Sequence, residues 1–286
     1  MKQNVLTRFY TSLIVFAVFL LIFVTSFASP IFEITVSLLV CFCVWEAIRG
    51  TGYAEKKIFM VPSLLYSMLI PLVFAFKPYV FQNRSAFYGV IILSFFYCIA
   101  SFILMMFNMK TLKFNNTTAI MFLSLIISSF LSCLVYIRRL ETHGFFYMVL
   151  AIVCCAWVTD IFAYFVGILI GKHHFAPLIS PKKTIEGSLG GALFSMGIFA
   201  LFCFIYQFIV PNVQFNWGLV LLYAFICTCV GQLGDLSFSL IKRSYGIKDF
   251  GSILPGHGGV LDRLDSLIFI APTFYFLLYI EPIIVL

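Results

Sequence analysis

Long apolar runs recur along almost the whole of this 286-residue chain and constrain its fold more than any other feature. Each is about 18 to 25 residues long, the length that an α-helix needs to cross the hydrocarbon of a bilayer. Only helices or closed barrels satisfy backbone hydrogen bonds in lipid, and these runs lack the two-residue alternation of barrel strands. The sequence therefore predicts an all-α, polytopic integral membrane bundle of about nine transmembrane helices. Their approximate positions are residues 9–27, 31–48, 58–76, 87–107, 118–137, 145–170, 188–210, 217–241 and 267–286.

The composition supports this class, because 63% of the residues are hydrophobic and only 10% are charged. The positive charges divide unevenly between alternate connections, and cytoplasmic loops hold the excess of Lys and Arg. We therefore expect the N-terminus in the cytoplasm and, after nine spans, the C-terminus outside. The cytoplasmic side receives 14 of the 18 cations, namely Lys2, Arg8, Arg49, Lys56, Lys57, Lys110, Lys113, Lys172, Lys182, Lys183, Lys242, Arg243, Lys248 and Arg263.

The formal net charge of +7 follows from this bias and one local cluster, so we do not expect nucleic acid as a partner. The first run could instead be a secretory signal peptide, because Lys2 and Arg8 precede it and small residues end it. The nine cysteines form no metal or disulfide pattern and are interpreted as packing residues. We expect a single membrane domain over residues 1–286, with apolar helices in 1–140 and the motif-bearing catalytic half in 141–286.

The sixth run contains an acidic residue deep within its apolar stretch. Asp160, Tyr164, Gly167 and Gly171 recur at helical spacing and share one face of the predicted helix. An ionisable group at such a position is costly in hydrocarbon and is a functional-site candidate, with a buried structural hydrogen-bonding role as the alternative.

The loop of residues 180–187, SPKKTIEG, precedes the seventh run. Ser180 is predicted to be the N-cap of the next helix and Pro181 its first residue, which places Lys182 and Lys183 in the first turn. Cations there oppose the helix dipole, which favours a bound anion between them. The alternative is that both lysines only set the topology, with Lys182 paired to Glu186 one helical turn later.

The eighth run carries a polar stripe along one face, which we expect to point into protein or water. It comprises Thr228, Gln232, Asp235, Ser239 and Lys242. The stripe leads into residues 239–265, called here the signature segment, which holds four cations, three carboxylates and five glycines. Gly256, Gly258 and Gly259 allow backbone N–H groups to approach an anion. Asp262 and Asp265, together with Asp235, could hold a hard divalent cation near phosphate oxygens. These residues indicate Mg²⁺-assisted chemistry on a phosphorylated substrate.

The signature segment resembles the signature of the phosphatidate cytidylyltransferases, also called CDP-diglyceride synthases. The matching positions are Ser239, Lys242, Arg243, Lys248, Asp249, Gly251, Pro255, His257, Gly258, Gly259, Asp262, Arg263 and Asp265. The 180–187 loop, residues 231–235 and residues 160–171 also resemble family motifs, so the likeness covers roughly the C-terminal half. The N-terminal spans match only as apolar helices.

The resemblance implies the transfer of CMP from CTP to phosphatidate, giving CDP-diacylglycerol and pyrophosphate, in phospholipid biosynthesis. It also implies Mg²⁺ as cofactor, a multi-pass protein of the bacterial inner membrane and an active site facing the cytoplasm. The number of metal ions and a homodimeric state stay open.

Roles for the individual residues follow from this implied reaction. Asp235 and Asp262 are the expected metal ligands, and Asp249 and Asp265 are expected either to join them or to orient basic side chains. The expected phosphate contacts are Lys182, Lys183, Lys242, Arg243, Lys248 and Arg263. The further expected substrate-binding residues are Asp160, Ser180, Thr184, Ser239, Gly256, His257, Gly258 and Gly259. We expect His257 to order the loop or contact phosphate, and not to act as a general base.

Two other classes are compatible with a membrane bundle of this kind. A CTP-dependent polyprenol kinase would transfer the γ-phosphoryl group to an alcohol and release CDP. A secondary transporter would also carry intramembrane charges, but repeated halves and broken spans are typical of that class. The gathering of charge at one face of this bundle favours an enzyme.

Overall fold

The computed structural model describes residues 20–21, 23–27, 30–52, 57–73, 84–108, 114–140, 143–253 and 258–285. Most of the predicted first span lies outside these residues, as do Gly256 and His257. The described residues form two compact units, drawn from Met1–Tyr136 with Ile247–Leu264 and from Ile137–Gly246 with Asp265–Leu286. These are called unit 1 and unit 2. The signature segment is therefore shared between them, with its middle in unit 1 and both ends in unit 2.

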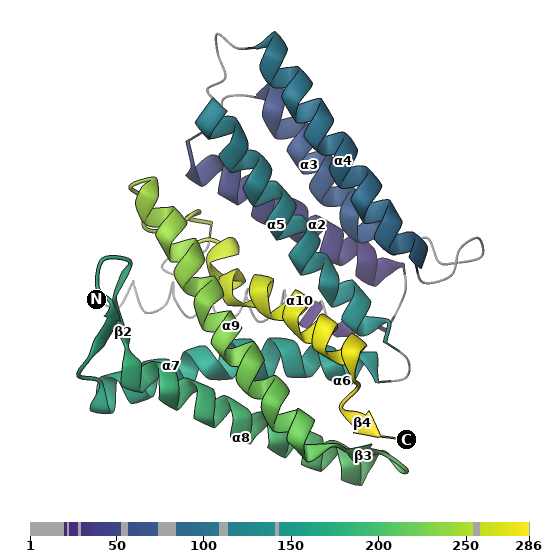
Figure 1. The fold of residues 1–286 in the computed structure, drawn as a ribbon, viewed down its shortest axis with the longest axis vertical. Coiled ribbons are helices and arrows are strands. Elements are labelled where there is room, and N and C mark those ends of the chain that lie inside the picture. The colour runs from purple at the N-terminus through teal and green to yellow at the C-terminus, as the bar shows by residue number, and fades with distance from the viewer. Residues whose placement is uncertain are drawn as a thin grey trace. The chain divides into compact units, whose positions relative to one another are not determined.

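Unit 1 is built from apolar helices that pack in chain order. Helix α2 (Ile31–Gly50) contacts α3 (Lys57–Val73), and α3 contacts α4 (Arg84–Phe107), as Figure 1 shows. Helix α5 (Phe114–Arg138) follows, and the short 3₁₀-helix η2 (Leu261–Arg263) contacts α2. Hydroxyl groups pair between the helices, for example Ser63 Oγ with the Tyr97 hydroxyl at 2.8 Å. Such pairing satisfies polar groups that would otherwise be buried alone.

Unit 2 contains the longest helices. The first is one continuous rod made of α6 (Gly144–Val149), the π-helical stretch η1 (Leu150–Val158) and α7 (Thr159–Ile170). Helices α8 (Ile185–Ile209), α9 (Trp217–Ser244) and α10 (Asp265–Ile280) follow. Two short antiparallel strand pairs accompany them. The pair of β1 (His174–Ala176) with β2 (Ser180–Thr184) lies between α7 and α8. Strand β3 (Gln214–Phe215), between α8 and α9, pairs with β4 (Ile284–Val285), which follows α10.

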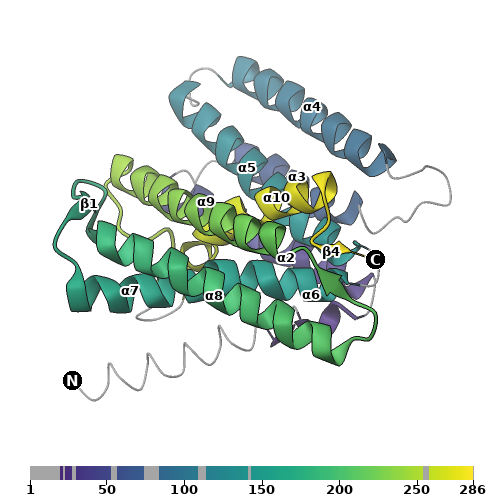
Figure 2. The same cartoon turned by 60° about the horizontal axis from the view of Figure 1, so that its bottom comes forward.

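Helices α7 and α8 lie side by side in Figures 1 and 2, and glycines permit their close approach. A Cβ atom at Gly191 would lie 2.7 Å from the carbonyl oxygen of Thr159, and one at Gly187 would lie 2.6 Å from that of Ala163. Backbones in such contact gain packing that larger side chains would prevent, which is the usual role of small residues between membrane helices. The contact fixes the first turn of α7, which carries Asp160.

The prediction of a mostly helical membrane protein is confirmed. Among the described residues, six helices are long and apolar enough to cross a membrane. Two shorter apolar helices, Ile58–Val73 and Asp265–Ile280, coincide with two more of the predicted runs. The total of nine spans and the sides on which the termini lie stay predictions.

Candidate active site

Charged side chains from four elements of unit 2 gather at one place. They are Asp160 on α7, Lys183 on β2, Asp235 and Lys242 on α9, and Asp265 at the start of α10, called here the lysine–aspartate cluster. Lys183 forms an ion pair with the carboxylate of Asp235. Lys242 Nζ lies 3.8 Å from Asp265 Oδ2. The sequence-predicted residues of the sixth run, the 180–187 loop and the eighth run are therefore brought together.

Helix α9 presents its polar stripe to this cluster because the residues are spaced at helical intervals. Ser239 Oγ donates to Asp235 Oδ1 at 3.4 Å, and Thr228 and Lys242 are buried in protein, as the stripe predicted. The helix begins after Asn216, whose side chain accepts from the amide of Leu219, and it ends at Ser244.

Basic residues at the end of α9 are stabilised by the helix itself. Gly246, at φ +68°, donates its N–H to the carbonyl of Arg243 and closes the last turn. Lys242 and Arg243 stand in that turn, where the helix dipole favours cations. Arg243 Nε also donates to the carbonyl of Ile179 at 3.4 Å. Two of the four cations of the signature segment, Lys242 and Arg243, are thus held by contacts within unit 2.

Asp265 is the most enclosed carboxylate of the lysine–aspartate cluster. It is 6% exposed, and its Oδ1 accepts from the amide of Ser266 at 2.9 Å in the first turn of α10. Burial and the negative charges of Asp235 and Asp160 disfavour the ionised form of Asp265, whereas the positive charge of Lys242 favours it. Three carboxylates stand here beside two lysines, so an added cation would lower their mutual repulsion.

The donor set of this cluster suits a hard cation such as Mg²⁺. Within the described part of the chain, no three His, Cys, Asp or Glu side chains are placed to enclose a metal ion. Mg²⁺, however, is commonly held by one or two carboxylates, with substrate phosphates and waters completing its shell. The carboxylates present fit that mode of binding, and they do not fit an all-protein metal cage.

The prediction that Ser180 caps the helix was wrong. Residues Ser180–Thr184 form β2, because their backbone pairs with β1. Thr184 caps α8 instead, its Oγ1 accepting from the amide of Gly187 at 3.2 Å. Lys182 and Lys183 therefore precede the helix and do not stand in its first turn, where the helix dipole would disfavour cations.

The structure also does not show the pairing of Lys182 with Glu186 that the alternative interpretation required. Glu186 contacts His173, at 2.6 Å between Oε1 and Nδ1, and accepts from the amides of Lys172 and His173. This carboxylate secures the start of the β1–β2 hairpin to α8. Lys182 is exposed and Lys183 turns toward Asp235.

The middle of the signature segment lies in unit 1 and is organised by Asp262. Its Oδ2 accepts from the amides of Phe250 and Gly259 at 3.0 and 2.9 Å. Gly258, at φ +81°, adopts a conformation that other residues rarely take. Asp262 thus joins the two sides of this loop. Its role as a metal ligand stays a prediction, as do the phosphate contacts of Lys248 and Arg263, which are both exposed.

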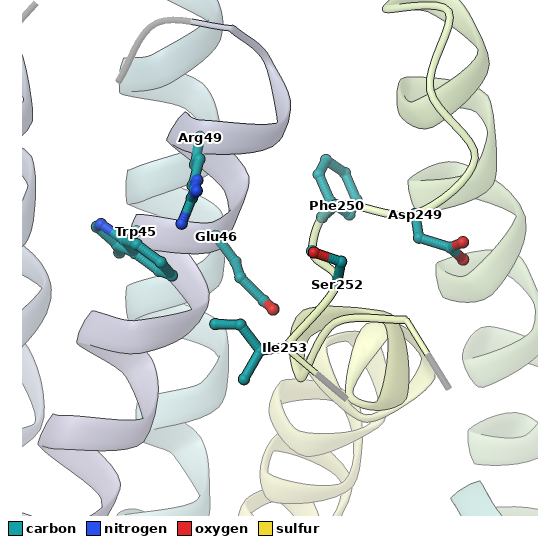
Figure 3. Close-up of a pocket in the computed structure, with 8 residues that line it drawn as sticks. Trp45, Glu46, Arg49, Asp249, Phe250, Ser252 and Ile253 are labelled. Carbon is teal, nitrogen blue, oxygen red and sulfur yellow. The ribbon is translucent and has the colours of Figure 1, made fainter. Parts of the chain in front are cut away.

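Glu46 on α2 also contacts the signature segment within unit 1. Its Oε2 accepts from the amide of Leu261 at 2.8 Å, and the residue is 1% exposed. Beside it is a cavity of about 380 Å³ lined by Trp45, Glu46, Arg49 and residues 249–253, as Figure 3 shows. The Arg49 guanidinium lies 5.2 Å from the ring centroid of Trp45.

Comparison with known proteins now identifies the family. Residues 6–281 match the cytidylyltransferase family. The chain belongs to this family. It is 40% identical over 169 residues to the phosphatidate cytidylyltransferase of Bacillus subtilis (strain 168), covering 59% of this chain and 61% of that protein.

Two staphylococcal relatives give the same result. Proteins named phosphatidate cytidylyltransferase from Staphylococcus haemolyticus (strain JCSC1435) and Staphylococcus epidermidis (strain ATCC 12228 / FDA PCI 1200) are 43% and 44% identical over 143 residues. Each match covers 50% of this chain and 53% of the relative. The chain thus spans about half to three fifths of the length of these relatives.

Sequence reasoning missed one residue of this cytidylyltransferase that contacts the signature segment. Glu46 stands inside the second apolar run, as Asp160 stands inside the sixth. An acidic residue is costly inside hydrocarbon at either position. The position of Glu46 inside an apolar run could therefore have identified it as a candidate. It was missed because the other charged candidates lie in the C-terminal half.

Proposed function

We propose that this cytidylyltransferase converts CTP and phosphatidate to CDP-diacylglycerol and pyrophosphate. The observation that carries the proposal is the family match over residues 6–281, within which the basic and acidic residues of the signature segment are held in ordered contacts. The names of relatives that are 40 to 44% identical support it. The acyl chains of the lipid would remain in the bilayer while its phosphate meets the nucleotide at the cytoplasmic face of the bacterial inner membrane.

The reaction needs little proton transfer. The second pKa of a phosphate monoester lies near 6, so the phosphatidate oxygen is already ionised at neutral pH. That oxygen attacks the α-phosphorus of CTP and forms a new P–O bond, while the bond from the α-phosphorus to the bridging oxygen breaks and pyrophosphate leaves. The protein has to reduce repulsion between two anions and stabilise the charge on the leaving group.

The lysines of the lysine–aspartate cluster can do this while they remain paired. An ammonium group has three N–H donors. Lys183, held by Asp235, and Lys242, held near Asp265, can therefore each keep one carboxylate contact and direct other donors at phosphate oxygens. Lys182, Arg243, Lys248 and Arg263 are the further proposed phosphate contacts, and Ser180 and Thr184 are proposed hydroxyl donors.

Asp235 and Asp262 are the proposed carboxylates for Mg²⁺, with Asp265 and Asp249 either joining them or orienting basic side chains. Mg²⁺ would supply positive charge next to the triphosphate. For Asp262 the proposal involves Oδ1, because two backbone amides already share Oδ2. Asp160 is proposed to contribute to substrate binding from α7.

The test follows both ends of the triphosphate. Purified protein is incubated with phosphatidate in detergent micelles, Mg²⁺ and CTP labelled at either the α- or the γ-phosphate. We expect α-label in the lipid product and γ-label in pyrophosphate. Release of CDP with γ-label in a lipid would instead identify a polyprenol kinase. In a separate measurement on protein in sealed vesicles, accumulation of substrate without nucleotide turnover would identify a transporter. An Asp235→Asn variant, prepared identically, is the control for contaminating activity.

A further inference from the structure

We infer that Glu46 of α2 is a positioning residue for the signature segment, which holds residues 258–262 in the conformation that the reaction requires. The inference rests on the proposed function, because that function gives the segment its chemical role. It gives helix α2 a role in the proposed reaction, although the N-terminal helices match the family motifs only as apolar spans.

The first observation is the contact itself. Glu46 and Leu261 are 215 positions apart, yet Glu46 Oε2 accepts from the Leu261 amide at 2.8 Å. A buried carboxylate that accepts from a backbone N–H group holds the turn to which that group belongs. Here that turn precedes Asp262 and Arg263 directly.

The second observation concerns two glycines that face the carboxylate. A Cβ atom at Gly259 would lie 2.6 Å from both Glu46 oxygens, and one at Gly251 would overlap Oε1. The described glycines with positive φ are Gly52, Gly246 and Gly258. The backbone conformation at positions 251 and 259 therefore does not require glycine. They instead leave room for Glu46, and the carboxylate fits between the two sides of the loop.

The third observation is the way in which Glu46 and Asp262 complement each other. Asp262 joins the amides of Phe250 and Gly259 from within the loop, and Glu46 holds the amide of Leu261 from α2. Figure 3 shows Glu46 reaching from α2 toward the strand of chain that carries Phe250, Ser252 and Ile253.

A double-mutant cycle tests the contact. Gly259→Ala, Glu46→Ala and the double variant are compared in the full-length protein by thermal unfolding in detergent and by turnover. We expect Gly259→Ala to lower kcat about tenfold in the wild-type background and to have little further effect once Glu46 is alanine. Effects that simply add would overturn the inference.

Hydrogen exchange separates positioning from a general loss of stability. We expect faster exchange in residues 258–264 for Glu46→Ala and near-normal exchange for Glu46→Gln, which retains an acceptor oxygen for the Leu261 amide. The fall in kcat should exceed the rise in KM for CTP, and Glu46→Gln should restore most of it. The matched control is Glu33→Ala, at a second buried glutamate on α2 about 20 Å away along the helix.

The outcomes distinguish this inference from the proposed function. Absence of CDP-diacylglycerol in the wild-type reaction would contradict the proposed function, while the exchange and unfolding measurements would still test Glu46. Unchanged exchange in residues 258–264 for Glu46→Ala, or the same change for Glu33→Ala, would refute the positioning role even in an active enzyme. Should Glu46→Ala not fold, Gly259→Ala, which crowds the same carboxylate, decides: exchange in residues 258–264 at the wild-type rate would refute the inference.

Discussion

The two ion pairs of the lysine–aspartate cluster differ in their access to water. The side chains of Lys183 and Asp235 are 30% and 23% exposed, whereas those of Lys242 and Asp265 are 10% and 9% exposed. Solvent weakens the first pair, and its loss costs little stability. Removing one partner of the second leaves a charge in protein interior, which is costly. Two lysines proposed for the same chemical task therefore have different structural consequences.

Substitution of each lysine by methionine separates these contributions. We expect Lys183→Met and Lys242→Met both to reduce turnover at least about tenfold, since each removes a proposed phosphate contact. Lys242→Met should also destabilise the protein by about 3 kcal/mol, and Lys183→Met by about 1 kcal/mol or less. Turnover and denaturant unfolding of the same preparations provide the measurement. Equal losses of stability would show that burial does not distinguish the pairs.

At the scale of the element, the helix that carries Asp160 is regular, although it directly follows a π-helical stretch that the sequence does not predict. The π-helical stretch η1 ends at Val158, and Asp160, Tyr164 and Gly167 all lie in the regular helix α7 that follows. These three residues keep the predicted helical spacing, whereas Gly171, the fourth residue of the predicted face, follows the end of α7 in an extended conformation. The phase of α7 relative to α6 is not that of one α-helix. The packing of α7 on α8 then sets where Asp160 stands.

The α7–α8 contact gives a prediction with a built-in control on the same helix. Gly191→Ala places a Cβ atom 2.7 Å from the Thr159 carbonyl, and Gly197→Ala places one where nothing lies within 4 Å. We expect Gly191→Ala to destabilise the protein by about 2 kcal/mol and to reduce turnover, since it displaces the turn before Asp160. Gly197→Ala should be neutral or up to about 1 kcal/mol stabilising. Thermal unfolding and turnover of both variants test this, and equal behaviour would contradict it.

For the whole molecule, the sequence predicts what depends on the pattern within one segment and misses what depends on pairing with another segment. Run length predicts the helices because crossing hydrocarbon requires a fixed number of residues. The spacing of Asp235, Ser239 and Lys242 predicts a shared face for the same local reason. The strand of residues 180–184 was missed because its partner β1 supplies the hydrogen bonds, and Glu46 was missed because its partner is 215 positions away.

Ligand-linked stability provides a prediction for the protein as a whole. Under the proposed function, carboxylates of the protein and substrate phosphates hold Mg²⁺ jointly, so Mg²⁺ and CTP should bind together. We expect either alone to raise the melting temperature little, and both together to raise it by several degrees. EDTA should abolish turnover without unfolding the protein. Asp262→Asn should remove most of the joint shift, and its turnover should fail to recover as Mg²⁺ is titrated. A full rise in melting temperature with CTP in the presence of EDTA would contradict joint binding of metal and nucleotide. Near-normal activity of Asp262→Asn would remove Asp262 from the proposed metal site.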